Sequence, residues 1–451
     1  MTHIIRHTAL TMLLTALTMT IGTARVQAKH SRFYEEFNDN YNILGIDLLN
    51  QTVEAADIKD FTYQKDIATF TFEEGTIYLA RPILGRPTTA IFLGKGHARI
   101  DVPSHVERQG LAYASRDTVV DVDFTVAAIR MSDDFDLRLK EKFTFSRQTM
   151  DWRSYNTMQK QKAEFFFDPR VMHEYDNYFE LMRSVYERAA DGYFWIDFGR
   201  FSFTFDPALP EEVTVGYELE QGNIAMTRAA VLQRKEKGIV DDTAMSRITY
   251  PTTCLSRQGN IVMRGLDGKY IDTGGVTARL VINRDSLRFV SLFLHYNLKL
   301  DSLFVDGQPA EYLRRKDFGH IGLILPAYRH RGDTLNVTFW YHGKDYSSML
   351  PFVADPKPSH LHLTFTSYAK YNYLVPEAQS LTPLRKGTER FLVAPEEPYR
   401  TFVFQPYASG FDTIPQVAAG TLPVMFLKSQ HLSKTLFECF IPDTKYYPPV
   451  L

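Results

Sequence analysis

The sequence predicts a mainly β protein with two β-sandwich-like or saddle-like domains and one prominent helix in the first domain. Short runs of β-branched and aromatic residues alternate with polar residues along most of the chain, which is typical of strands with one buried face. A clear helical period is confined to the segment near residues 169–190. The chain of 451 residues is longer than one hydrophobic core commonly supports, so two domains are expected.

The first 28 residues predict an export signal. Arg6 precedes the apolar run Ala9–Ile21, and Val26-Gln27-Ala28 offers small residues for cleavage. We therefore expect a mature chain that starts near Lys29 and is periplasmic or extracellular. The alternative is an uncleaved anchor. No later segment approaches the roughly 20 apolar residues that spanning a bilayer requires, so we expect no transmembrane segment after signal removal.

Charge and cysteine content exclude several classes of protein. The chain has 51 Lys and Arg against 53 Asp and Glu, and removing Arg6 and Arg25 with the signal leaves 49 against 53, a net charge of −4. Nucleic acid is not an expected partner, because its binding requires a basic surface. Cys254 and Cys439 are too few for a disulfide scaffold or a structural zinc site. They can form one bridge or remain two buried thiols.

Residues 29–250 make up the predicted N-terminal β-rich domain. It begins with an amphipathic segment in which Phe33, Phe37 and Tyr41 recur at four-residue spacing. In the helix near residues 169–190, Asp168 can cap the start, Pro169 can begin it and Gly192 can end it. The apolar stripe of that helix consists of Tyr178, Leu181, Met182, Val185 and Ala189.

Two glycine-containing stretches predict tight turns between strands. Glu73-Glu74-Gly75 joins predicted strands at 66–72 and 76–80, and Gly94-Lys95-Gly96 stands between two further runs of strand residues. A phosphate loop would need a Ser or Thr after the lysine and a helix directly after the glycines. Neither is present, so we predict a hairpin in which Gly96 takes a positive φ.

Residues 251–451 make up the predicted second, β-saddle-like domain. The charged stretch 233–243 is the linker candidate, and Asp306-Gly307 is a hairpin turn. The expected strands of this domain include 276–282, 289–300, 302–305, 321–325 and 334–341.

The most tempting catalytic motif begins at His173-Glu174. It resembles the start of H-E-x-x-H, in which two histidines on one helix face bind zinc and the glutamate activates water. The second histidine is replaced by Asn177, and an amide is a poor zinc ligand. We therefore interpret this stretch as ordinary helix surface.

Four other groups of residues are candidate sites. His360 and His362 can point to one face of a strand, although no third metal ligand is evident. Asp133, Asp134 and Asp136 lack the glycine and distant glutamate of a calcium loop, which favours a solvated turn. Asp121 and Asp123 share a strand face, and Ser409-Gly410 lacks the first glycine of a nucleophile elbow. The sequence therefore assigns no catalytic, cofactor-binding or metal residue.

Several stretches resemble a known family. GTIYLARPILGR at Gly75–Arg86, AIFLGKG at Ala90–Gly96, Asp191–Phe194, and Asp206-Pro207 with Glu211–Val213 are similar to the N-terminal extension of exported bacterial proteins related to the gluzincin zinc aminopeptidases. LDSLFVDG at Leu300–Gly307, Asp333–Leu335 and WYHG at Trp340–Gly343 resemble the β-saddle domain that precedes the catalytic domain of those enzymes. The family's G-x-M-E-N and H-E-x-x-H motifs are missing, and Leu451 falls about where a catalytic domain would begin.

Three functions follow as expectations. The first is an exported, non-catalytic accessory or interaction protein built from aminopeptidase-like modules, with an unknown protein or peptide partner and no cofactor. The second is the N-terminal fragment of a zinc aminopeptidase whose catalytic domain is absent from this chain. The third is a carbohydrate- or surface-binding β protein, since aromatic residues, 14% of the chain, can supply a sugar-stacking surface.

Overall fold

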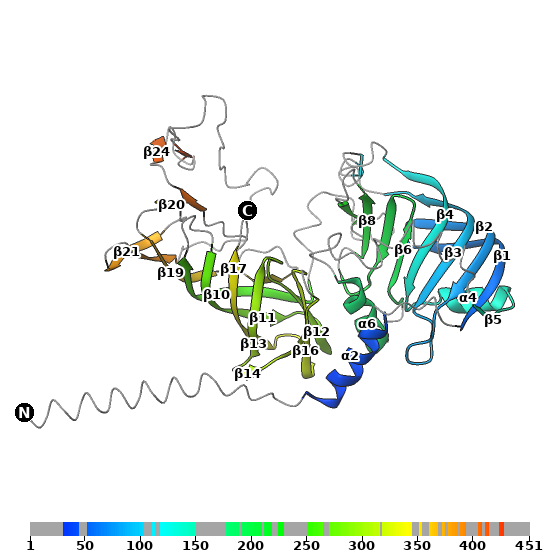
Figure 1. Cartoon of the computed structure of the whole chain (residues 1–451), viewed down its shortest axis with the longest axis horizontal. Coiled ribbons are helices and arrows are strands. Elements are labelled where there is room, and N and C mark those ends of the chain that lie inside the picture. The colour runs from blue at the N-terminus through cyan, green and yellow to red at the C-terminus, as the bar shows by residue number, and fades with distance from the viewer. Residues whose placement is uncertain are drawn as a thin grey trace, which may run out of the picture.

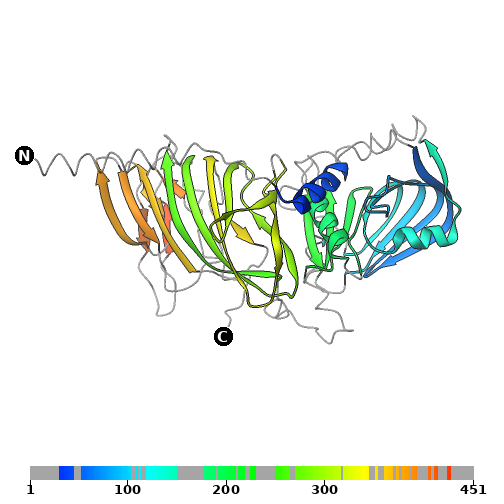
Figure 2. The ribbon, with the colours of Figure 1, turned by 90° about the horizontal axis from the view of Figure 1, so that it is seen from below.

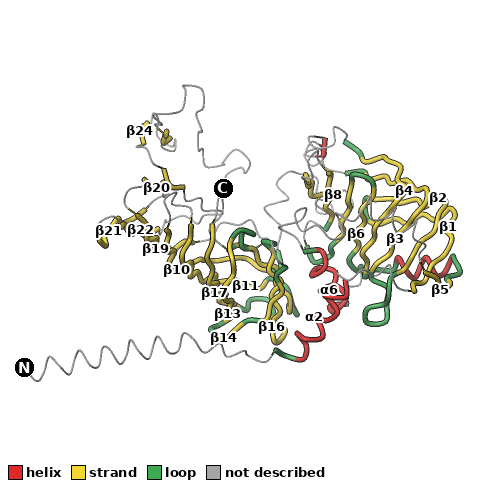
Figure 3. Tube along the Cα trace, viewed as in Figure 1, coloured by secondary structure: helices red, strands yellow, loops and turns green. Residues whose placement is uncertain are grey.

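The protein is mainly β, as expected, and its three described helices lie beside or between sheets (Figure 3). The computed structural model describes residues 30–44, 52–102, 108, 111–112, 118–149, 176–188, 191–209, 212–218, 224–229, 250–264, 270–315, 318–344, 351–353, 360–368, 372–374, 378–385, 388–393, 405–407, 411–414 and 424–427. The predicted signal segment, the linker candidate 233–243, Ser409 and Cys439 lie outside these residues. No described helix is long and apolar enough to cross a membrane.

The first sheet has nine antiparallel strands in the order β5-β1-β2-β3-β4-β6-β7-β8-β9. Its strands are β1 (Thr52–Lys65), β2 (Ala68–Leu79), β3 (Thr89–Ile100), β4 (Val120–Met131), β5 (Ser146–Thr149), β6 (Phe194–Phe198), β7 (Phe201–Phe205), β8 (Val213–Glu218) and β9 (Ile224–Ala229). One face carries a phenylalanine-rich core, in which Phe70 lies 5.6 Å from Phe203 between ring centroids. Helix α4 (Phe135–Lys142) adds Phe135 and Leu139 to this core.

The two predicted glycine turns are wrong, because both stretches lie inside long strands. β2 runs through Gly75 and β3 runs through Gly94 and Gly96 without turning, and the ladder shifts register at these points. Gly96 is not at positive φ; a Cβ there would lie 2.5 Å from the Phe124 ring. The glycines therefore allow close approach at irregularities in a curved sheet, a role that sequence spacing does not distinguish from a turn.

The second half contains two sheets packed face to face around one core. The larger has the order β14-β13-β17-β11-β10-β19-β22-β21 and comprises β10 (Thr252–Arg264), β11 (Tyr270–Ile282), β13 (Leu298–Val305), β14 (Gln308–Pro309), β17 (Thr334–Lys344), β19 (His360–Tyr368), β21 (Ala378–Arg385) and β22 (Thr388–Val393). The smaller has the order β15-β16-β12-β18 and comprises β12 (Leu287–Phe293), β15 (Glu311–Leu313), β16 (His320–Arg329) and β18 (Phe352–Val353). Two short pairs follow: β20 (Asn372–Leu374) with β23 (Gln405–Tyr407), and β24 (Phe411–Ile414) with β25 (Val424–Leu427).

Most predicted strands of this half are present, with one informative error. The segment expected as a single strand over 289–300 is divided between β12 and β13, which belong to different sheets. Between β12 and β13 the chain passes from the smaller sheet to the larger sheet. The Asp306-Gly307 hairpin is confirmed, since both residues have positive φ and join β13 to β14.

Helices α2 (Arg32–Leu44) and α6 (Asn177–Glu187) lie between the nine-stranded sheet and the second half (Figures 1 and 2). Phe37 on α2 and Phe179 on α6 pack against Phe289 on β12, with ring centroids 5.1 and 6.1 Å from Phe289. The same cluster includes Trp195 on β6. The amphipathic segment read from Phe33, Phe37 and Tyr41 is thus the helix α2, whose apolar face joins the two halves.

Helix α6 starts later than the sequence suggested. Its N-cap is Asp176, whose side chain accepts hydrogen bonds from the backbone of Tyr178 at 3.0 Å and Phe179 at 3.3 Å. Asp168 and Pro169 lie outside the described residues, and Gly192 does not end the helix, which closes at Arg188. The expected apolar stripe is confirmed at Tyr178, Leu181 and Met182, which are buried.

The interpretation of Asp133, Asp134 and Asp136 as a solvated turn is wrong. Asp133 and Asp136 are buried, and Asp134 is the N-cap residue of the short helix α4. The Asp133 carboxylate accepts from the Tyr63 hydroxyl at 2.6 Å and lies 2.8 Å from Lys65 Nζ, while Asp136 pairs with Arg86. Their cationic partners come from distant parts of the chain, which is why the local sequence resembled a polar turn.

Candidate functional site

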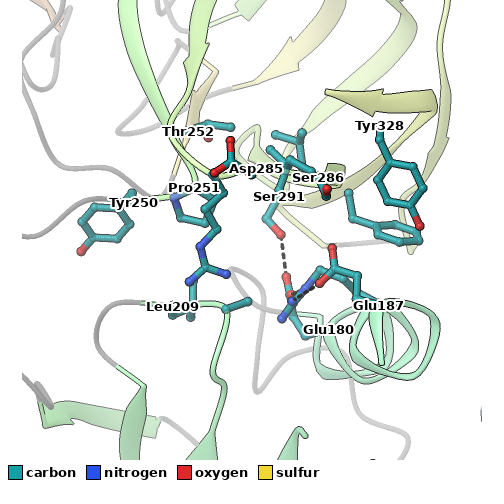
Figure 4. A pocket seen from close by; sticks show the side chains of 16 residues that line it. Glu180, Glu187, Leu209, Tyr250, Pro251, Thr252, Asp285, Ser286, Ser291 and Tyr328 are labelled. Atoms are coloured by element: carbon teal, nitrogen blue, oxygen red, sulfur yellow. Dashed lines mark hydrogen bonds and ion pairs between the residues drawn. The ribbon is translucent and has the colours of Figure 1, made fainter. Parts of the chain in front are cut away.

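A pocket of about 510 Å³ opens at the junction of the two halves (Figure 4). One wall is the last two turns of α6, with Glu180, Arg183 and Glu187, and the turn at 208–209 extends it. The opposite wall comes from residues 250–252, the segment 284–291 and Tyr328 on β16. The pocket therefore joins α6 to segments that follow it by about sixty residues or more in the chain.

Arg183 is the centre of a buried cluster of charges in the wall of this pocket. Its Nε lies 2.7 Å from Glu180, its Nη1 3.0 Å from Glu187, and its Nη2 2.7 and 2.9 Å from the two oxygens of Asp206. Glu180 and Glu187 stand three residues before and four after Arg183, so one helix face presents all three. Asp206 follows β7, which brings it to the same place.

Glu180 connects α6 to the second half. Its Oε1 accepts from the Ser291 hydroxyl on β12 at 2.5 Å, which Figure 4 shows, and His320 Nε2 on β16 lies 3.4 Å from the same oxygen. Burial by itself would raise the pKa of Glu180, but Arg183, His320 and the Ser291 hydroxyl outweigh it. Together they lower this pKa from 4.5 to about 2. Glu180 is therefore an ionised anchor between the two halves.

The net pKa shift of the other two carboxylates, Glu187 and Asp206, is opposite to that of Glu180. Desolvation raises the pKa of Glu187 and of Asp206, and Arg183 offsets this only in part. Across the pocket, Arg284 donates to the carbonyl of Pro207 at 3.2 Å, and burial lowers its pKa. Arg284 is thus a second polar contact between the two halves.

This arrangement can hold the two halves together and offers a cavity for a ligand. Each carboxylate on Arg183 already has a cationic partner within 3.0 Å, so its charge is used in fixing α6. Residues around Phe289, Tyr250 and Tyr328 add apolar surface to the same cavity. Pockets with an apolar wall and a few converging polar groups are the usual sites for small ligands.

Most of the motif that begins at His173-Glu174 lies outside the described residues. His173 and Glu174 lie outside the described residues, and Asn177 is the first residue of α6.

The remaining candidates lie apart from the pocket. His360 and His362 are both exposed on β19, two residues apart as expected, and the described residues contain no group of three or more His, Cys, Asp or Glu arranged to hold a metal. Asp121 and Asp123 do share an exposed face, where His97 Nε2 and Nδ1 lie 3.0 and 2.9 Å from them.

Of the two cysteines, Cys254 belongs to the described part of the chain and Cys439 does not. Cys254 is buried, and its Sγ lies 3.6 Å from the carbonyl oxygen of Ser256. Cys439 lies outside the described residues, so both the bridge and the pair of thiols stay predictions.

Sequence reasoning missed the residues that make the pocket. Glu180, Arg183 and Glu187 have the spacing of ordinary helix-surface ion pairs, and nothing local marks them as buried. The available signal was their position on a helix already predicted to carry an apolar stripe. Placing Arg183 close to that stripe predicts a buried guanidinium in need of carboxylates.

Comparison with known proteins finds only a limited structural similarity. No family model and no curated protein matches this sequence. Among solved structures, an M1 zinc metallopeptidase from Deinococcus radiodurans aligns at 16% identity over 39% of this chain and 46% of its own, with a TM-score of 0.33. A two-domain M1 zinc metallopeptidase mutant bound to L-tryptophan aligns at 16% identity over 39% and 47%, also with a TM-score of 0.33. This chain spans less than half of either structure, and no residue role is carried over from them.

Proposed function

We propose that this chain is an exported, non-catalytic accessory or interaction protein, with its binding pocket at the junction of the two halves. The observation that supports this proposal is the cluster around Arg183, whose guanidinium donates hydrogen bonds to carboxylates on α6 and to Asp206. Glu180 in this cluster also accepts a hydrogen bond from Ser291 in the second half. The cluster holds two β units in one orientation. A fixed junction with an adjoining cavity suits recognition of a partner or ligand.

Zinc analysis and a peptidase assay test the non-catalytic part of the proposal. The mature chain, starting near Lys29, is dialysed, analysed for zinc, and incubated with alanine p-nitroanilide with and without added zinc. We expect neither retained stoichiometric zinc nor release of nitroaniline. Zinc-dependent turnover that disappears in Glu174→Ala, but persists in the exposed control Glu141→Ala on α4, would overturn the proposal and favour an aminopeptidase.

Export has its own test. Expression of residues 1–451 in a bacterial host with an outer membrane, followed by fractionation and N-terminal sequencing, should recover protein beginning near Lys29 outside the cytoplasm. Recovery only in the cytoplasm with Met1 intact would remove export from the proposal.

A second candidate function, carbohydrate binding, is favoured by the outer face of the larger sheet. Trp340 on β17 is 44% exposed and lies over Gly275 on β11, where a Cβ would come within 2.6 Å of the indole. Tyr270 is 40% exposed and pairs with Lys344, four residues along β17 from Trp340, so both rings share this face. Aromatic rings among polar strand residues can stack on sugar rings while neighbours hydrogen-bond to hydroxyls.

A further inference from the structure

We propose that the outer face of the larger sheet binds an extended chain of neutral sugars. A diagonal row of three aromatic rings would stack on the sugar rings, and the side chains of Asp301 and His342 would accept hydrogen bonds from the sugar hydroxyls. This inference rests on the carbohydrate candidate of the proposed function, because it names the ligand class and the polar contacts of that same site. The junction pocket has no part in it.

The aromatic row consists of Tyr270 on β11, Trp340 on β17 and Phe304 on β13, three neighbouring strands. Phe304 lies opposite Thr338, two residues before Trp340, so its ring shares the face of Trp340. Tyr270 lies opposite Lys344, four residues after Trp340. Strand geometry gives the row a length of roughly 22 Å. No single sugar ring covers that length, whereas an extended β-1,4-linked chain does.

Gly275 on β11 allows the indole of Trp340 to lie flat against the sheet. A Cβ atom at Gly275 would come within 2.6 Å of the six-membered ring of the indole, so this ring covers the bare backbone of β11. Because Trp340 is 44% exposed, the other face of the indole is open to solvent. A flat aromatic ring with one open face is suited to stacking on the apolar face of a sugar. Gly275 is therefore a positioning residue for this site.

Asp301 and His342 supply hydrogen-bond acceptors beside the Trp340 ring. His342 lies two residues after Trp340 on β17 and so shares its face, and its Nδ1 lies 2.8 and 2.9 Å from the two oxygens of Asp301. A carboxylate only accepts hydrogen bonds, so Nδ1 of a neutral His342 carries the proton and Nε2 is an acceptor. The remaining carboxylate lone pairs and Nε2 therefore all accept, which matches the hydroxyl donors of a sugar.

The charges that border the aromatic row decide between neutral and acidic sugars. Lys299 lies opposite His342 and Lys344 lies opposite Tyr270, and both lysines are exposed. Such lysines attract acidic sugars only weakly, because solvent and salt screen exposed charges. A sugar carboxylate stacked on the centre of the row would lie near the Asp301 carboxylate, which repels it. We therefore assign neutral sugars to this face.

Calorimetric titration of the full mature chain with matched saccharides tests the proposal. At least one of cellohexaose, mannohexaose and xylohexaose should bind with a Kd of about 1 mM or tighter. The disaccharide of the same sugar should bind at least about tenfold more weakly, because it cannot reach all three rings. Added salt should leave the affinity unchanged. A β-1,4-linked mannuronate hexamer, which is acidic, should bind more weakly than the neutral hexasaccharide.

Three variants locate the site. Asp301→Asn should weaken binding of the hexasaccharide by about fivefold, while Asp101→Asn, the same change at an exposed position of the first half, should leave it unchanged. Phe304→Leu, at a half-buried position, should weaken binding by about threefold. Gly275→Ala should displace the Trp340 ring from the sheet, which weakens binding and increases quenching of tryptophan fluorescence by iodide. Thermal unfolding confirms that each variant is folded.

The outcomes separate this inference from the proposals on which it rests. Equal affinity for the hexasaccharide and the disaccharide, or unchanged affinity in folded Asp301→Asn and Phe304→Leu, would overturn the extended site but not carbohydrate binding itself. Tighter, salt-sensitive binding of the mannuronate hexamer would overturn the neutral class. If no saccharide binds, both this inference and the carbohydrate candidate fall, whereas the non-catalytic assignment depends on the zinc and peptidase assays alone.

Discussion

Gly75 on β2 and Gly94 on β3 are paired across the first sheet so closely that neither position has room for a Cβ atom. A Cβ at Gly75 would lie 2.6 Å from the Cα of Gly94, and one at Gly94 would collide with the Glu74 carbonyl. The neighbouring strands approach here because the ladder shifts register beside both residues. These glycines therefore shape the long β2–β3 pair rather than end it.

Replacing Gly94 with alanine should lower the free energy of unfolding by about 2 kcal/mol or more, because the strands must separate to admit the methyl group. Urea denaturation followed by circular dichroism measures this loss. Lys95→Ala is the control in the same strand: its side chain is 68% exposed and forms a surface ion pair with Glu73, so little change is expected. Equal stability of Gly94→Ala and the parent would contradict the close pairing.

The contribution of Glu180 to stability should depend on pH with a definite sign. Its pKa is lowered from 4.5 to about 2 in the folded protein, so its stabilising effect is complete above pH 4.5 and is lost as the pH falls toward 2. Glu180→Gln should therefore cost about 3 kcal/mol near pH 7 and progressively less below pH 4.5. Denaturation of both proteins at several pH values gives the difference.

The parent protein and Glu180→Gln must be compared because the contributions of the neighbouring carboxylates to stability change with pH in the opposite direction. Burial raises the pKa of Glu187 and of Asp206, so their contributions favour folding at low pH and are lost as the pH rises through their raised values. Glu35→Gln, at an exposed position on α2, controls for the substitution itself. A difference between parent and Glu180→Gln that stays constant from pH 7 to pH 3 would refute the anchoring role.

Phe289 should be essential for joining the two halves. Its ring lies within 6.1 Å of Phe33, Phe37 and Phe179 between centroids, so Phe289→Ala should lower stability by about 3 to 5 kcal/mol. Phe304→Ala on β13 removes the same ring from a half-buried position and should cost less. Thermal unfolding in which Phe289→Ala is no worse than Phe304→Ala would argue against the shared core.

Trp340 offers a fluorescence test of the carbohydrate candidate. The chain has three tryptophans; Trp195 is buried and Trp340 is 44% exposed. Titration with soluble neutral β-linked oligosaccharides should shift the emission to shorter wavelength as a sugar ring covers the indole. Trp340→Phe should lose the shift, whereas Tyr296→Phe, at an exposed tyrosine in the connection between β12 and β13, should keep it. Unaltered emission throughout the titration would reject this candidate.

The local part of the structure was readable from the sequence. The strand patterns over 321–325 and 334–341 predicted parts of β16 and β17, and the spacing of Phe33, Phe37 and Tyr41 predicted the apolar face of α2. The Asp306-Gly307 turn was also correct, because positive φ at two adjacent residues is a local preference that both residue types tolerate. In each case the signal and the structure span fewer than about fifteen residues.

The sequence by itself determined the mainly β class, most strands and the helix stripe, since these depend on periodicity and intrinsic conformational preference. Only the tertiary structure decided that Gly75 and Gly94 lie within strands, because close approach depends on which strand is the neighbour. It also decided that Asp133 is buried and that Arg183 collects three carboxylates, because a buried charge is stabilised by partners brought from distant segments. Long-range pairing, rather than local pattern, creates the junction pocket and the cluster of charges around Arg183.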